Sequence, residues 1–221
     1  MRTTMDIDAN ITGMNFEKDE INEMIDDILS IKIDDNVIFE VEKNVPIKED
    51  NEYGGYRFKL IAKLSNLKIP FSIDISTGDL ITPRAVEYKY KTILENNQIS
   101  LYTYNYETII AEKFETIIRR NILTTRIRDF YDVYMLINTQ YKNINSIILR
   151  QAIRETAMHR ETLNIVNDCE NIIKEMQHDD GLQQMWEKYR KQNFYAEDIQ
   201  FNDLILALFK VAEIYKEKNI E

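Results

Sequence analysis

The chain has 221 residues, of which 44% are hydrophobic and 30% charged, enough for one large domain or two small ones with an ordinary globular core. A net charge of -10 counts against a dedicated nucleic-acid scaffold, although it allows a local basic patch. The single cysteine, Cys169, excludes an internal disulfide framework and suits a reducing cytosol.

The first residues show no signal peptide, and the longest apolar run, Leu204 to Phe209, is far shorter than the roughly 18 residues that a membrane span needs. We therefore expect a cytoplasmic protein with no membrane partner.

The first hundred residues mix strand and helix periods. Thr3 to Thr12 alternates like a strand, and Asn15 is expected to cap a helix from Phe16 to Ile31. Its apolar stripe comprises Ile21, Met24, Ile25, Ile28 and Leu29. Further strands are expected at Val37–Val45, Tyr56–Leu64 and Ile69–Ser76, followed by a hairpin of Tyr88–Leu94 and Ile99–Tyr104.

After Asn105 the apolar residues recur at helical spacing, with breaks near Arg160, His178–Gly181 and Asn193. About four helices are expected after Ile144. This order predicts an α+β protein: a sheet-containing core over residues 1–104, and a helical region over residues 105–221 packed on that core.

Asp6 and Asp8 stand two apart on the first strand, so both carboxylates face one way, about 6.5 Å apart along the backbone. Carboxylates held this close repel each other unless water, cationic partners or a divalent cation surround them. The commoner explanation for such a pair alone is the solvent face of a strand.

The stretch FSIDISTGD adds a third carboxylate. Ser72, Asp74 and Ser76 alternate with apolar residues, so Asp74 lies on the polar face of a second strand. If that strand neighbours the first, the three aspartates could hold one or two Mg²⁺ ions, which activate a hydroxyl and stabilise phosphate charge. The alternative is a strand-end aspartate beside a turn.

The stretch AEKFETIIRRNILTTRIRDFYDVYML is rich in cations. Lys113 lies in a strongly apolar helix, and four arginines follow closely: Arg119, Arg120, Arg126 and Arg128. Asp129 and Asp132 share a helix face, and so do Arg128 and Asp132. Surface ion pairs of little energetic value are one explanation; a cationic cluster for nucleotide phosphates, oriented by the two aspartates, is the other.

The segments RTTMDID, IDIS, AEKFETIIRR and RDFYD, in this order, resemble the AbiEii-type nucleotidyltransferase toxins of bacterial abortive-infection and type IV toxin–antitoxin systems. The resemblance runs from Arg2 to Ile137. Beyond Asn138 the likeness is limited to a helical end. The resemblance implies a polymerase-β-like nucleotidyltransferase fold, in which a mixed sheet presents aspartates to a metal ion and a nucleoside triphosphate.

The resemblance also implies residue roles. Asp6, Asp8 and Asp74 would bind Mg²⁺ or Mn²⁺, and Asp74 would also position or deprotonate the acceptor hydroxyl. Lys113 and Asp129 would act directly in catalysis, with Asp132 supporting them. The residues expected at the nucleotide are Arg2, Thr4, Lys113, Arg119, Arg120 and Arg128. The expected reaction is nucleotide transfer from a nucleoside triphosphate to RNA, with tRNA as the expected acceptor, countered by a cognate antitoxin.

The family carries a Gly-Gly or Gly-Ser turn before its aspartate pair, whose backbone amides would hold the triphosphate. Here Met1 stands where that segment should end, so we expect the chain to fold but to bind nucleoside triphosphates weakly and to transfer little or no nucleotide to RNA. This leaves two rivals: a non-catalytic member that keeps the fold and antitoxin binding, and a metal-dependent phosphohydrolase. His159 and His178 lie outside the motifs, so no zinc site or histidine triad is expected.

Overall fold

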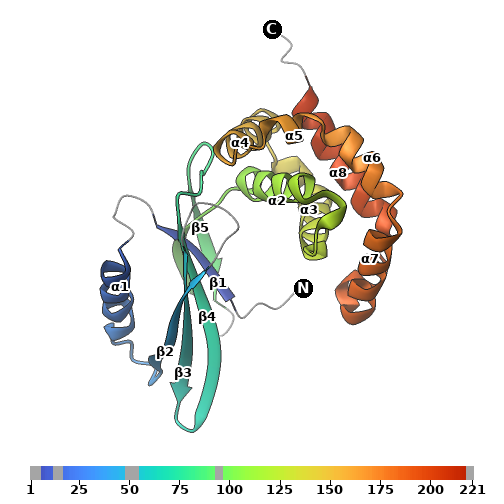
Figure 1. The fold of residues 1–221 in the computed structure, drawn as a ribbon. Coiled ribbons are helices and arrows are strands. Elements are labelled where there is room, and N and C mark those ends of the chain that lie inside the picture. The colour runs from blue at the N-terminus through green and yellow to red at the C-terminus, as the bar shows by residue number, and fades with distance from the viewer. Residues whose placement is uncertain (1–5, 12–16, 48–54, 93–96, 218–221) are drawn as a thin grey trace. The chain divides into compact units, whose positions relative to one another are not determined.

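The computed structural model describes residues 6–11, 17–47, 55–92, 97–217. They form two compact units, which divide between Asp79 and Leu80. The first unit holds a four-stranded sheet and one helix, and the second holds a two-stranded ribbon and the remaining helices (Figure 1).

The sheet of the first unit is mixed. Its strands are β1 (Asp6–Ile11), β2 (Ile38–Ile47), β3 (Gly55–Leu64) and β4 (Leu67–Thr77), in the order β1-β4-β3-β2. β1 runs parallel to β4, whereas β3 is antiparallel to both β4 and β2. The first strand of the chain is thus a neighbour of the fourth, a placement that strand alternation alone does not reveal.

One face of this sheet is apolar and packs against helix α1 (Lys18–Ser30). Ile21 and Ile25 of the helix are buried in one cluster with three strand residues: Phe58, Leu60 and Ile75. Period-2 alternation then sends the polar residues of β3 and β4 to the opposite face. The expected helical stripe is confirmed except at Ile28, which is 51% exposed. The expected cap, Asn15, lies outside the described residues.

The ribbon pairs β5 (Val86–Lys91) with β6 (Gln98–Thr103), and the expected hairpin is confirmed. The unit boundary precedes this ribbon, whereas the sequence places it after residue 104. Hydrogen bonds explain the difference. Thr82 N–H donates to Thr108 Oγ1 at 3.1 Å, and Asn105 Nδ2 donates to the Thr82 carbonyl at 2.7 Å, so the chain from Leu80 onward is tied to the first long helix. The expected packing of the helical region on the sheet core stays a prediction.

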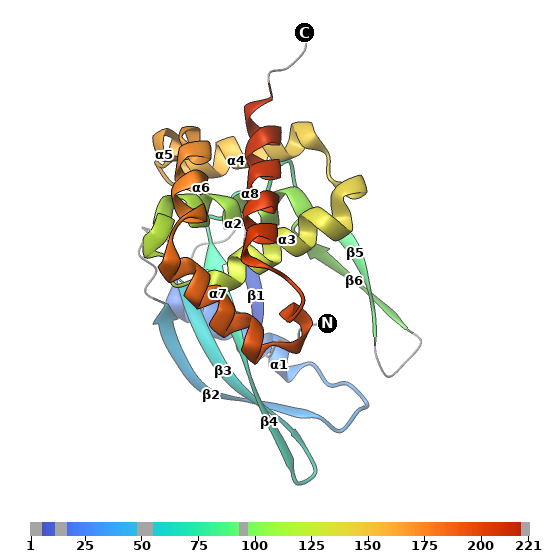
Figure 2. The same cartoon turned by 90° about the vertical axis from the view of Figure 1, so that its right-hand side faces the viewer.

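The described helices of the second unit are α2 (Tyr106–Arg120), α3 (Ile127–Gln140), α4 (Ser146–His159), α5 (Leu163–Asn167), α6 (Cys169–Gln177), α7 (Asp180–Gln192) and α8 (Phe201–Lys216). α2 is central: Ile110, Phe114 and Ile117 on it are 0% exposed. α8 packs against α3, α4 and α6 (Figure 2). Asn105, Asn145 and Asp179 cap α2, α4 and α7 through their side chains.

The α+β prediction is confirmed, since a mixed sheet is followed by a helical C-terminal region. After Ile144 the described residues form five α-helices rather than about four, because the chain also breaks at Asp168, between α5 and α6. None of the described helices combines the length and the apolar character needed to cross a bilayer.

Candidate functional site

The polar face of the sheet brings two of the predicted metal ligands together. Asp8 on β1 and Asp74 on β4 are direct partners in the parallel register, and Asp6 is the partner of Ser72. Directly opposed residues on neighbouring strands share a face. The expectation that Asp74 lies on the face of the aspartate pair is therefore confirmed for the backbone positions. We call Asp8, Asp74 and Arg57 the sheet cluster.

Arg57 is a member of this cluster that the sequence did not single out. It lies on β3 directly across from Asp74 and donates to both carboxylate oxygens, from Nε to Oδ1 at 2.6 Å and from Nη2 to Oδ2 at 2.5 Å. The side chains of Arg57 and Asp74 are 44% and 18% exposed. The row Arg57–Asp74–Asp8 crosses three strands. Alternation within GYRFKL places Arg57 on a polar face, but only the register places it at Asp74.

The donor chemistry of the sheet cluster fits Mg²⁺ or Mn²⁺. Carboxylate oxygens are preferred ligands of Mg²⁺, which commonly takes one or two of them and completes its shell with water and substrate phosphates. Asp8 and Asp74 supply two such groups, and Asp6 belongs to the same strand. Within the side chains that the structure describes, no three His, Cys, Asp or Glu come together as a metal site. The metal role of these aspartates stays a prediction.

A second polar cluster, the helix cluster, lies between α2 and α3. Lys113 Nζ is 3.1 Å from Asp129 Oδ1 and 2.8 Å from Asp132 Oδ2, and Arg126 Nε donates to Asp129 Oδ2 at 2.8 Å. Asp129 is 5% exposed and Lys113 is 25% exposed. The two helices therefore place two carboxylates around one ammonium group, and the phosphate-binding role of this stretch stays a prediction.

The helix cluster fixes the charge of Lys113. Burial by itself lowers the pKa of this ammonium group, but the charges and hydrogen bonds of Asp129 and Asp132 outweigh burial and raise the pKa above its ordinary value. Lys113 is consequently a cation at neutral pH and is suited to neutralising phosphate, not to accepting a proton. Its expected approach to the sheet aspartates stays a prediction.

The other predicted nucleotide contacts lie on α2 and α3 or outside the described residues. Arg119 Nε donates to Glu115 Oε1 at 3.0 Å on its own helix. Arg120 ends α2 and Arg128 is exposed on α3. Arg2 and Thr4 lie outside the described residues. Their roles stay predictions.

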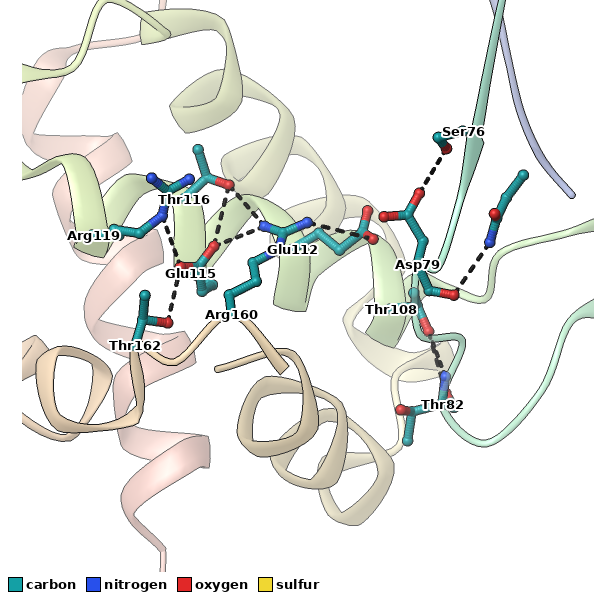
Figure 3. A network of polar contacts seen from close by, with 11 residues as sticks. Ser76, Asp79, Thr82, Thr108, Glu112, Glu115, Thr116, Arg119, Arg160 and Thr162 are labelled. Carbon is teal, nitrogen blue, oxygen red and sulfur yellow. Dashed lines mark hydrogen bonds and ion pairs between the residues drawn. The ribbon is translucent and has the colours of Figure 1, made fainter. Parts of the chain in front are cut away.

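Glu115 is the centre of a buried network that the sequence did not indicate (Figure 3). Its carboxylate is 0% exposed and accepts from Arg160 Nη1 at 2.7 Å, from Thr162 Oγ1 at 3.0 Å and from Arg119. These partners come from α2 and from the α4–α5 connection. The network links α2 to the α4–α5 connection, and we assign it a structural role.

The chain matches the family model described as "Nucleotidyl transferase AbiEii toxin, Type IV TA system" over residues 1–207. No protein of curated function matches it. Two solved structures are similar: the crystal structure of JHP933 from Helicobacter pylori, with 15% identity and a TM-score of 0.47, and that of a putative nucleotidyltransferase from H. pylori, with 15% identity and a TM-score of 0.45. Each alignment covers 97% of this chain, and 77% and 79% of the respective solved chains.

The family match extends the resemblance seen in the sequence motifs. Those motifs end at Ile137, whereas the match continues through most of the helical region to residue 207. It confirms the predicted family and fold class, a polymerase-β-like nucleotidyltransferase mixed sheet followed by helices.

Proposed function

The chain belongs to the AbiEii nucleotidyltransferase toxin family of type IV toxin–antitoxin systems, and from this premise we propose that it transfers a nucleotide from a nucleoside triphosphate to RNA, with tRNA as the expected acceptor. The observation that carries the proposal is the direct register of Asp8 and Asp74 on parallel strands. Membership of this family also implies an antitoxin partner.

The sheet cluster would hold the metal ion. Asp8 and Asp74, with Asp6 on the same strand, would be the ligands of Mg²⁺ or Mn²⁺, which when bound offsets the charge of the triphosphate. Asp74 would also position the acceptor hydroxyl or help to deprotonate it. A carboxylate can do this because each oxygen has more than one lone pair that can accept a hydrogen bond.

The helix cluster would supply fixed positive charge. Lys113 stays protonated beside Asp129 and Asp132, so it can stabilise the negative charge that develops on the phosphates without itself changing protonation state. Arg126, which binds Asp129, and Arg128 would add further cations at the start of α3. Asp129 would hold the ammonium group in place.

A transfer assay tests this proposal. The chain is incubated with each α-labelled nucleoside triphosphate, Mg²⁺ or Mn²⁺ and total tRNA, and label on RNA is measured together with released phosphate and pyrophosphate. We expect a low level of labelled RNA together with released pyrophosphate, and a further loss of about 100-fold or more in Asp8→Asn and Asp74→Asn. Asp26→Asn, an exposed carboxylate of α1, is the matched control and should transfer normally.

Three results would contradict the proposal in different ways. Folded protein without any labelled RNA would favour the non-catalytic alternative. Phosphate release without labelled RNA would favour the phosphohydrolase. Full transfer by Asp74→Asn would remove Asp74 from the site.

A further inference from the structure

We propose that Arg57 is a positioning residue for the metal site: it holds the Asp74 carboxylate in the orientation that binds the ion. This inference rests on the proposed function, because it assigns a role to Arg57 within the same site. Arg57 itself would touch neither substrate nor metal.

The geometry of the pair supports this role. Both nitrogens of the guanidinium fork bind Asp74, one to each carboxylate oxygen, at 2.6 and 2.5 Å. A bidentate contact of this kind fixes the rotation of the carboxylate plane, which a single hydrogen bond does not. A carboxylate offers about four lone-pair sites, so two remain for a cation.

The position of Asp74 within the sheet supports it as well. Asp74 is flanked by Asp8 on β1 and by Arg57 on β3. Like charges directly opposite each other destabilise a sheet, whereas opposite charges stabilise it. Arg57 therefore offsets the repulsion between the two aspartates.

A competing role for Arg57 predicts the opposite effect of its removal on metal binding. If Arg57 merely occupies the Asp74 carboxylate in place of the metal, its removal should strengthen metal binding. If Arg57 positions Asp74, its removal should weaken binding by about 10- to 100-fold, the usual effect of removing the residue that orients a metal ligand.

The test measures the affinity of the full chain for Mn²⁺, without nucleotide, by electron paramagnetic resonance titration. The site in question is the Mn²⁺ site that is present in the wild-type chain and lost in Asp8→Asn. We compare Arg57→Gln, which removes the charge, with Arg57→Lys, which keeps the charge but loses the fork. Lys63→Gln is the matched control, because Lys63 lies on the same strand in an ion pair with Glu40 of β2, at the far end of the sheet.

We expect a loss of about 10- to 100-fold for Arg57→Gln, a smaller loss for Arg57→Lys, and wild-type affinity for Lys63→Gln. Unchanged or tighter binding in Arg57→Gln overturns the role of Arg57 and leaves the proposed function standing. If Arg57→Gln does not fold, the Mn²⁺ affinity of Arg57→Lys tests the inference instead. Wild-type affinity in Arg57→Lys would then overturn it. A wild-type chain with no Mn²⁺ site sensitive to Asp8→Asn overturns the inference, whereas the transfer assay decides the proposed function.

Discussion

Glu115 and Arg160 form an ion pair in the helical unit: Arg160 Nη1 lies 2.7 Å from Oε2 of Glu115, whose side chain is 0% exposed. The same carboxylate also binds Arg119 and Thr162. A buried carboxylate requires such partners, because its desolvation is otherwise strongly unfavourable.

Replacing Glu115 by Gln should therefore lower the free energy of unfolding by about 3 kcal/mol, since Arg119 and Arg160 lose the buried carboxylate that they share. The matched control is Glu187→Gln in the more exposed pair with Arg190, where Glu187 is 41% exposed and the expected loss is below about 1 kcal/mol. Urea unfolding followed by circular dichroism measures both. Equal losses would show that the Glu115 network adds nothing beyond a surface pair.

The charge of Lys113 predicts a specific pH dependence. Because the folded pKa is raised above the ordinary value of 10.5, the stabilisation is fully present below that value and is lost as the pH rises through the folded pKa. The difference in unfolding free energy between wild type and Lys113→Met should stay constant from neutral pH to about pH 10 and shrink above it. Urea unfolding across this range measures the difference. Lys188→Met, which changes an exposed lysine of α7, should show no such trend.

Asp129 and Asp132 should differ in their importance for stability. Asp129 is 5% exposed and binds both Lys113 and Arg126, whereas Asp132, which also binds Lys113, is 19% exposed and so loses less solvation on folding. We expect Asp129→Asn to cost about 2–3 kcal/mol and Asp132→Asn about 1 kcal/mol in unfolding free energy. Thermal and urea unfolding of the two variants, compared side by side, checks the order. A reversed order would mean that Asp132 contributes more than Asp129 to the stability of the helix cluster.

Trp186 is the single tryptophan of the chain and reports on the helical unit. It is 0% exposed, its Nε1 donates to the Ile199 carbonyl at 3.0 Å, and it stacks on Tyr189. Its fluorescence should be blue-shifted in the folded chain and resistant to acrylamide. Trp186→Phe should cost about 1–3 kcal/mol through the lost hydrogen bond, whereas Leu123→Ala, at an 86% exposed position, should stay within about 0.5 kcal/mol.

The sequence by itself determined the local structure around each motif. Alternation within FSIDIST places Asp74 opposite the apolar face that holds Ile75, and helical spacing places Phe114 and Ile117 in the core of α2. These predictions succeed because a side chain's direction follows from the period of its own element. The motifs were also sufficient to indicate the family, which the match over residues 1–207 confirms.

Only the tertiary structure decided which charged residues meet. The parallel pairing of β1 with β4 sets Asp8 beside Asp74, and the antiparallel pairing of β3 with β4 adds Arg57 to the row. Likewise, the packing of α2 on α3 gives Lys113 its two carboxylate partners, and the α4–α5 connection brings Arg160 to Glu115. Periodicity fixes the face of a strand or helix on which a residue lies, but register and packing between distant segments depend on the whole core, and those contacts created the polar clusters of this protein.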